Sequence, residues 1–319
     1  DRLILTCPDY VCRNYHELVE TESYPPCYRI IPTLSIFTIH SWMSALQLER
    51  FEQKASQLSE RLKRCNSNWE DAFFITLARN FGFGLNGDAF ETWANRIPLR
   101  AVDKHRDELF QIEAFFFGQA GLLQGTAGDE YYLRLKKEYE YLSHKFGLTP
   151  MDVSQWRFLR LRPTNFPHIR IAQLAVLYHR SYGLLSRIME AETVTKVHEI
   201  LKGGTSAYWV NHYTFEHPSP SRPKTLSNSS LDLLIINTVA TFLYSYGVHK
   251  GKEEYCARAG AFLEELKAEY NYITRMWEQC GIKAANASDS QALIQLKKEY
   301  CDKKKCLYCR IGYEYLKRN

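Results

Sequence analysis

The sequence predicts an all-α fold, a multi-helix globular domain with a cysteine-containing C-terminal tail packed on it. Apolar residues recur at three- and four-residue spacing through most of the chain, which is the period of a helix with one buried face. No stretch after residue 6 alternates apolar and polar residues over the length of a strand. The chain also has 21 Tyr and 17 Phe, and such rings fill wide gaps between packed helices.

We expect an irregular N-terminal connector over residues 1–34 and a helical domain over residues 35–319. Prolines at 25, 26 and 32 oppose helix formation in the connector, and residues 2–6 resemble the end of a strand. Within the domain, residues 214–230 are rich in proline and serine and form the clearest long loop. Residues 290–319 are the cysteine-containing tail.

The individual helices follow from apolar spacing and from start and stop signals. Ser67 with Glu70 and Ser288 with Gln291 have the spacing of a capping box. Asn165 or Thr164 is placed to cap a helix that has Pro167 in its first turn. In chain order we expect helices over residues 35–64, 67–78, 86–97, 107–123, 129–146, 167–189, 231–246, 253–266, 269–279 and 291–300.

Composition excludes several classes of protein. The longest apolar run, residues 231–246, is interrupted by Asp232 and Asn237 and is shorter than the ~18 residues of a membrane span, so we expect no membrane partner. Nine cysteines at irregular spacing do not form the pattern of a secreted disulfide framework. We therefore expect a cytoplasmic protein.

The net charge of +5 resides entirely in the tail. Residues 290–319 contain eight Lys or Arg and three Asp or Glu, and the rest of the chain has 33 of each sign. Clustered cations are typical of a surface that binds an anion such as nucleic acid. The candidate binding residues here are Lys303, Lys304, Lys305 and Arg310.

Three cysteines in the same tail suggest a metal centre. Cys301, Cys306 and Cys309 have C-x4-C-x2-C spacing, which lets several sulfurs approach one zinc ion or one iron–sulfur cluster. Both centres need four ligands, and the nearest further cysteine in sequence is Cys280, followed by Cys256. The alternative is three reduced thiols on a packed tail, because cysteine is among the most buried residue types.

A second cationic stretch lies between residues 153 and 189, which contain six arginines and no acidic residue before Glu190. Its centre is a run of candidate anion-binding residues, Arg160, Arg162, Asn165, His168 and Arg170. Arginines beside the free N–H groups of a helix start favour phosphate or carboxylate binding. The alternative is that these arginines pair with acidic residues of neighbouring helices.

Five segments together resemble a bacterial family known as domain of unknown function 2851: residues 115–123, 156–175, 208–215, 235–239 and 290–312. The resemblance implies no particular activity. It does imply that family members are longer at the N-terminal side, with a β-rich, endonuclease-like segment of which only the strand at residues 2–6 would be present here.

Three functions follow, in order of preference. The first is a helical nucleic-acid-binding module that serves an upstream, nuclease-like domain of the same protein. The second is a structural or protein-interaction scaffold without nucleic acid or metal, which the neutral body and aromatic core suggest. The third is an enzyme acting on an anionic small molecule at residues 160–170, with His168 or His212 as acid or base.

Overall fold

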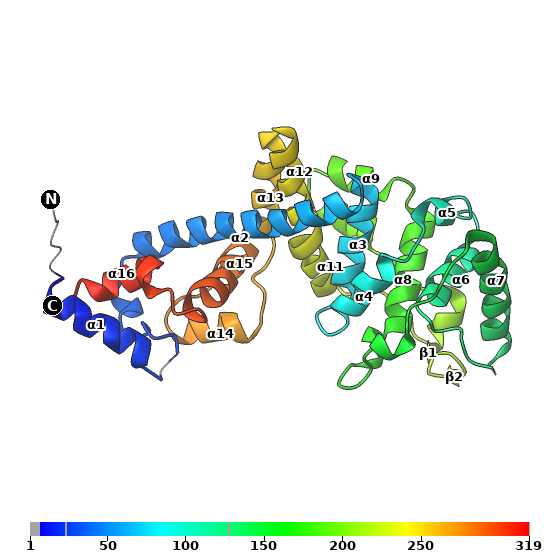
Figure 1. Ribbon diagram of the computed structural model, residues 1–319, viewed down its shortest axis with the longest axis horizontal. Helices are drawn as coiled ribbons and strands as arrows, with labels where there is room; N and C mark the ends of the chain where they lie inside the picture. The colour runs from blue at the N-terminus through cyan, green and yellow to red at the C-terminus, as the bar shows by residue number, and fades with distance from the viewer. Residues whose placement is uncertain (1–6, 23, 127, 319) are drawn as a thin grey trace. The chain divides into compact units, whose positions relative to one another are not determined.

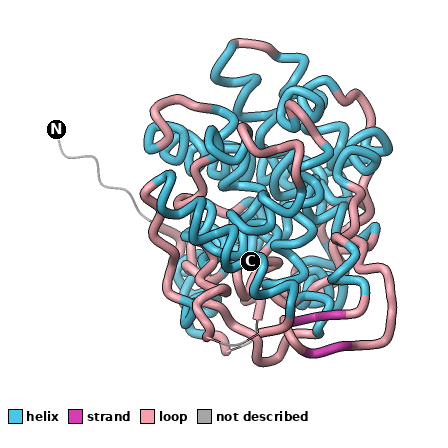
Figure 2. The backbone as a smooth tube through the Cα atoms, turned by 90° about the vertical axis from the view of Figure 1, so that its right-hand side faces the viewer, coloured by secondary structure: helices cyan, strands magenta, loops and turns pink. Residues whose placement is uncertain are grey.

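The structure is a computed structural model that describes residues 7–22, 24–126 and 128–318. Helices make up most of it, which confirms the all-α fold class (Figure 1). Over the described ranges, the only paired strands are β1 (His212–Thr214) and β2 (His217–Pro218), a short antiparallel hairpin (Figure 2). The strand predicted at residues 2–6 lies outside the described residues.

The chain forms two compact units. Unit 1 contains residues 1–57 and 247–319, and unit 2 contains residues 58–246. The chain passes between them within helix α2 (Ile36–Arg64) and within helix α12 (Ala240–Lys250). This division differs from the predicted single helical domain after residue 34, because the N-terminal segment supplies core residues to the C-terminal helices.

Unit 1 joins the two ends of the chain. Its N-terminal part has α1 (Asp9–Glu20), the 3-10 turn η1 (Ile31–Thr33) and the first part of α2; its C-terminal part has α13 (Glu253–Glu265), α14 (Tyr272–Gln279), α15 (Ala287–Gln295), η6 (Leu296–Cys301), η7 (Cys306–Tyr308) and α16 (Arg310–Leu316). The Asn14 side chain on α1 donates to the carbonyl oxygens of Leu316, at 3.3 Å, and Arg318, at 2.7 Å.

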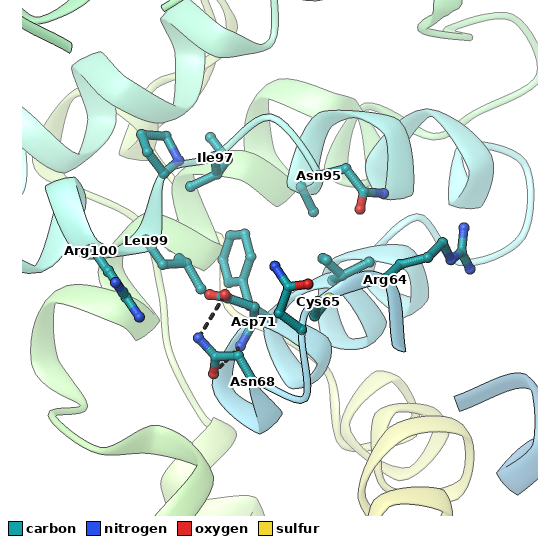
Figure 3. A pocket seen from close by; sticks show the side chains of 13 residues that line it. Arg64, Cys65, Asn68, Asp71, Asn95, Ile97, Leu99 and Arg100 are labelled. Atoms are coloured by element: carbon teal, nitrogen blue, oxygen red, sulfur yellow. Dashed lines mark hydrogen bonds between the residues drawn. The ribbon is translucent and has the colours of Figure 1, made fainter. Parts of the chain in front are cut away.

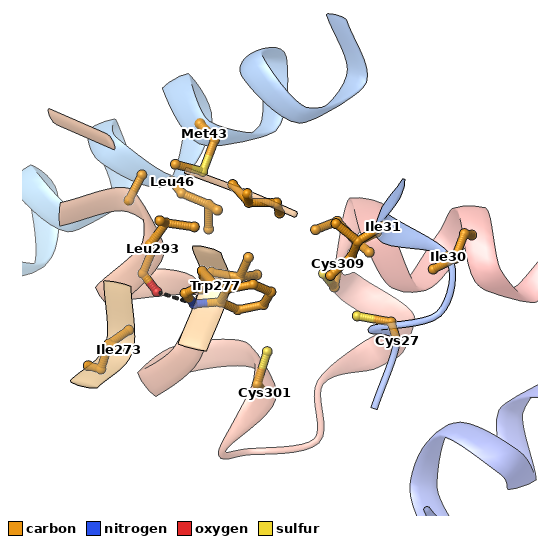
Figure 4. Close-up of a cluster of buried hydrophobic side chains, with 14 of the residues drawn as sticks. Cys27, Ile30, Ile31, Met43, Leu46, Ile273, Trp277, Leu293, Cys301 and Cys309 are labelled. Carbon is orange, nitrogen blue, oxygen red and sulfur yellow. Dashed lines mark hydrogen bonds between the residues drawn. The ribbon is translucent and has the colours of Figure 1, made fainter. Parts of the chain in front are cut away.

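The core of unit 1 surrounds Trp277, whose indole donates to the Leu293 carbonyl at 3.2 Å (Figure 4). Both ends of the chain contribute to this core: Leu18, Cys27, Ile30 and Ile31 come from the N-terminal segment, and Cys301, Cys309, Ile311 and Leu316 come from the tail. The predicted connector is therefore part of a hydrophobic core, and the tail packs against it.

Unit 2 is a bundle of shorter helices. They are α3 (Trp69–Phe81), α4 (Gly87–Ala94), α5 (Leu99–Asp103), α6 (Leu109–Gln119), α7 (Glu130–Phe146), α8 (Pro167–Arg180), α9 (Leu184–Glu190), α10 (Val194–Leu201) and α11 (Asn228–Leu234), with the 3-10 turns η2 (Val153–Gln155), η3 (Pro163–Asn165) and η4 (Ala207–Val210). The π-helical segment η5 (Ile235–Val239) continues α11. Helix α6 is buried along Ile112–Gln119 and packs on α7 and α8. Its lack of a polar face explains this central position.

Several helix boundaries differ from the predicted ones. Asn68 caps α3 in place of Ser67, because its side chain accepts from the N–H groups of Glu70 and Asp71. Asn286 caps α15 in place of Ser288 and accepts from the Asp289 N–H. The helix predicted over residues 167–189 is two helices, because Gly183 adopts φ 61° and interrupts the helical hydrogen bonds.

Residues 228–250 form a helical run of 23 residues that is long and apolar enough to cross a membrane. Its most apolar window is 67% buried inside the protein. A core helix of a globular protein meets the same two criteria, and the burial agrees with that assignment. The cytoplasmic location stays a prediction.

Candidate nucleic-acid interface and cysteine cluster

The arginine-rich segment of unit 2 does not present its predicted binding residues on one surface. Arg160 and Arg162 are exposed, whereas Arg170 is buried. Arg160 has φ 66°, a left-handed conformation in the turn before η3. None of these three arginines forms an ion pair with an acidic residue in the described part of the chain. The ion-paired alternative is therefore not what the structure contains.

Arg170 is held by neutral groups. Its guanidinium donates to Gln173 Oε1 at 2.8 Å and to Asn165 Oδ1 at 2.6 Å, and it lies 4.3 Å from the centre of the Phe83 ring. Burial lowers the pKa of Arg170 to about 10. Because Asn165 is used in this contact, it does not cap α8, whose N-cap is Phe166 without a side-chain hydrogen bond. Arg170 and Asn165 thus stabilise the start of α8 from inside the unit.

His168 lies inside an aromatic cluster. Its ring is 5.3 Å from Phe215, 5.7 Å from Phe158 and 5.9 Å from Trp209 between ring centres. Burial lowers the pKa of His168 to about 3, and its Nδ1 atom has no hydrogen-bond partner. The ring is therefore neutral at ordinary pH and out of reach of a dissolved anion.

The predicted cations of the tail are all exposed: Lys303, Lys304, Lys305 and Arg310. Lys303 pairs with Glu299, and Arg310 lies 3.7 Å from Glu314. Lys304 donates to the Val19 carbonyl at 2.7 Å. Lys304 and Lys305 make no ion pair with any acidic residue that the structure describes, so their charges remain available to a ligand.

A groove of about 340 Å³ lies between α2 and the end of the tail. We call it the tail groove; its lining residues are Phe37, Thr38, Ser41, Trp42, Ala45, Leu307, Tyr308, Cys309, Arg310 and Tyr313. Phe37 is 82% exposed and Tyr308 77% exposed. Exposed rings gathered on one surface mark an interaction site, because their burial by a partner is favourable.

Four cysteines line one small cavity in unit 1. Cys27, Cys301, Cys306 and Cys309 surround it together with Pro26, Tyr300, Lys305 and Gly312, and its volume is about 10 Å³. Figure 4 shows Cys27 on the N-terminal segment and Cys301 and Cys309 on the tail. Cys280, the predicted fourth ligand, does not line this cavity, although it is close enough to affect the Cys27 thiol. The structure thus brings Cys27 to the three tail cysteines.

The thiols of this cluster act on one another. Burial first, and then the Cys309 and Cys306 thiols, raise the pKa of Cys27 to about 12. Burial also raises the pKa of Cys301, with further contributions from Cys27, Cys309 and Cys306. All nine cysteines are free. As the described side chains stand, no group of three or more His, Cys, Asp or Glu could hold a metal ion.

Cys309 is surrounded by N–H groups. It is the N-cap residue of α16. Burial raises the pKa of its thiol, while the backbone N–H groups of Gly312 and Ile311 and the indole of Trp42 oppose the rise. The Trp42 nitrogen is buried and has no hydrogen-bond partner at normal geometry. These donors limit the rise, although burial still leaves the pKa of the Cys309 thiol above its ordinary value.

Unit 2 contains a larger pocket, of about 510 Å³, at the start of α3 (Figure 3). Its wall carries Arg64, Asp71 and Arg100, and the Asn68 side chain donates to Asp71 Oδ2 at 2.7 Å. Burial raises the pKa of Asp71, and Arg100 opposes that rise. The pocket was not predicted from the sequence, because its charges come from three separate segments that share no motif. Because the pocket wall carries charges of both signs, it does not indicate a particular class of ligand.

A family model described as a protein of unknown function (DUF2851) matches residues 1–272. The match covers more than half of the chain. The chain belongs to the DUF2851 family. The matched region includes Cys27 and ends before the cysteine-containing tail, whereas the predicted resemblance extended to residue 312. Comparisons with curated proteins and with solved structures found no match.

This DUF2851 chain also contains one buried carboxyl group that sequence reasoning missed. Glu113 lies on α6 and accepts hydrogen bonds from Tyr131 and, at 2.8 Å, from Ser206. Burial raises the pKa of Glu113 to about 7, although those hydrogen bonds oppose the rise. The available signal was an acidic residue inside an otherwise apolar run. None of the cavities described above reaches Glu113, so we assign it a structural role in the DUF2851 fold.

Proposed function

We propose that this chain is a helical nucleic-acid-binding module and that unit 1 binds a single strand in the tail groove. The observation that carries the proposal is the mixture of exposed rings and exposed cations on one surface. Phe37, Tyr308 and Tyr313 offer flat apolar faces, and Arg310 lies among them. Lys303, Lys304 and Lys305 extend the positive charge beside the groove.

Base stacking explains why a single strand is the preferred occupant. Each stacked base contributes about 1–3 kcal/mol, and a strand without a complement leaves its base faces free. A duplex hides those faces and offers only phosphates to the lysines. Single-strand binding of this kind is sequence-tolerant, because every nucleobase has a face that can stack.

Charge favours nucleic acid over the predicted alternative, a protein-interaction scaffold. A partner helix would cover the rings equally well, but it would not need three adjacent lysines. A nucleic acid accounts for the lysines, because each contact between a lysine and a phosphate releases a condensed counterion and makes binding depend on salt. The enzyme alternative loses one of its two candidate acid or base residues, because His168 is buried and neutral in unit 2. The other, His212, stacks on the Tyr208 ring and has its Nδ1 atom 2.9 Å from the Tyr208 carbonyl oxygen.

The test measures the affinity of the purified chain for a fluorescent 30-nucleotide oligo-dT by anisotropy over a salt series. We expect K303A/K304A/K305A to lower the slope of log K against log salt by roughly 2–3, since each phosphate contact contributes roughly 1. We expect Tyr308→Ala to weaken binding by about 1–3 kcal/mol with little change in that slope.

The matched control removes three exposed lysines outside the tail, in K137A/K196A/K267A. Lys196 pairs with Glu199 as Lys303 pairs with Glu299, so the control also breaks one surface ion pair. It should leave the affinity and the slope nearly unchanged. Absence of binding by the wild-type chain at low salt would refute the proposal and favour the scaffold. That this module serves an upstream, nuclease-like domain of the same protein stays a prediction.

A further inference from the structure

We propose that Cys27, Cys301, Cys306 and Cys309 are the four ligands of a metal centre, a zinc ion or an iron–sulfur cluster held by thiolates. The proposal replaces Cys280 with Cys27 as the fourth ligand, and it does not depend on nucleic-acid binding. It assigns a structural task to the N-terminal segment, because one ligand would come from residue 27 and three from residues 301–309.

The first argument is the convergence of the cysteines. Four of the nine cysteines line a cavity that has only eight lining residues, although Cys27 and Cys301 are 274 positions apart in the sequence. Burial of free cysteine as a small apolar residue explains one or two thiols in a core. It does not explain why Cys27 joins the three cysteines of the distant tail around the same space. Four cysteine ligands are the usual set for both structural zinc and iron–sulfur clusters.

The second argument is the surroundings of the sulfurs. Metal-bound thiolates carry excess negative charge and are stabilised by N–H donors and cations around them. Cys309 has the N–H groups of Ile311 and Gly312, and the buried Trp42 nitrogen is an unused donor beside it. Lys305 lines the cavity, and Lys304 acts on the Cys306 thiol. Neutral thiols in a purely apolar cluster would not require such N–H donors and cations around them.

The third argument is a close backbone contact that shapes the cysteine loop. A Cβ atom at Gly312 would lie 2.1 Å from the Cys306 carbonyl oxygen, so only glycine allows η7 to pack this closely on α16. Gly312, Cys306 and Cys309 all line the cavity, so this contact shapes the part of its wall that holds two of the cysteines. The described side chains still do not form a group that could hold an ion. The four cysteines line the same cavity as protonated thiols, and rotation about χ1 could turn each sulfur towards its centre when a metal replaces the proton.

The size of the cavity means that each candidate centre would require a different rearrangement of its lining residues. At about 10 Å³ it has room for a body of about the size of one water molecule. A zinc ion, bound at about 2.3 Å from each sulfur, requires the thiols to move inward. An iron–sulfur cluster is larger than the cavity and would require its lining residues to move apart. Both outcomes preserve the same four ligands.

The test measures zinc and iron in the full chain after anaerobic purification without a chelator, together with the absorption spectrum. We expect either one zinc per chain and no visible absorption, or iron with the brown colour of a cluster. Cys27→Ser should lose most of the metal. The matched control Cys280→Ser should retain it, since Cys280 is a partly buried cysteine of the same unit outside the cavity.

Two results would overturn the assignment: wild-type protein without stoichiometric zinc or iron, or a Cys27→Ser variant that keeps its metal while Cys280→Ser loses it. A second measurement uses only the wild-type protein, so it still tests the assignment if a variant fails to fold. In the wild-type protein, alkylation mapped by mass spectrometry should find the four ligand cysteines protected together and released together by metal removal. Four thiols that react equally before and after metal removal, or a disulfide among them, would contradict the proposal.

Discussion

Two arginines show how the surroundings of a residue decide its role. Arg170 is buried and donates to Asn165 and Gln173, whereas Arg310 is exposed beside the rings of the tail groove. Both belonged to the predicted set of anion-binding residues. Of the two, only Arg310 lies where a dissolved anion can reach it. Alanine at position 170 should therefore lower stability, whereas alanine at position 310 should weaken ligand binding.

We expect Arg170→Ala to lower the free energy of unfolding by about 2–4 kcal/mol, because it leaves the buried Gln173 oxygen and the half-buried Asn165 oxygen without their donor and empties the space beside Phe83. Chemical denaturation measures this loss. Arg162→Ala, at an exposed position, is the control and should change stability by less than about 0.5 kcal/mol. An Arg170→Ala variant as stable as the wild type would show that the buried contact is not structural.

The buried carboxyl group of Glu113 makes stability depend on pH. Its folded-state pKa of about 7 is above the ordinary value of 4.5, so the folded state holds a proton that the unfolded state releases. This stabilisation is complete below pH 4.5 and is lost as pH rises to about 7. The amide in Glu113→Gln resembles the protonated carboxyl group, so we expect the variant to gain up to about 3 kcal/mol over the wild type between pH 5 and pH 8.

Denaturant unfolding of both proteins at several pH values measures the difference. Glu140→Gln, which changes an exposed carboxylate on α7, is the control and should follow the wild-type pH dependence. If the difference in stability between Glu113→Gln and the wild type did not change with pH, Glu113 would not be the protonated group described above.

At the scale of elements, the turn between η7 and α16 determines the position of the cysteines. Gly312→Ala places a methyl group against the Cys306 carbonyl, and both groups belong to backbone that cannot move independently. We expect this substitution to reduce the metal content of the purified chain although all four cysteines are still present. Gly260→Ala is the control, because a Cβ at that glycine meets nothing within 4 Å. Equal metal content in the two variants would contradict this role of Gly312.

The helical spacing of apolar residues predicted most helices. The helix ends that it missed were decided by competing capping residues and by a glycine. The spacing of apolar residues gave α2 and α7 nearly to their ends. It could not show that the asparagines at 68 and 286 would take the N-cap positions from nearby serines, because both residue types have the required oxygen. It also missed the break at Gly183, since a single glycine is often tolerated inside a helix.

At the scale of the whole molecule, the candidate site depends on residues distant in sequence. The tail cations and three of the cysteines were visible as a local cluster. Cys27 was not, because only the fold of unit 1 brings the N-terminal segment to the tail. Phe37 and Trp42 were likewise indistinguishable from the core residues of an amphipathic helix. The sequence therefore predicted the charge and part of the chemistry, and long-range packing supplied the groove and the fourth thiol.

The most direct test of the proposed function is photo-crosslinking of the wild-type chain to a single strand that carries 5-bromodeoxyuridine, with the crosslinked residues identified by mass spectrometry. The tail groove predicts crosslinks to Trp42, Tyr308 or Tyr313, and their disappearance when unlabelled oligo-dT is added in excess. Crosslinks confined to residues 157–170 of unit 2, or no crosslinks at low salt, would contradict it.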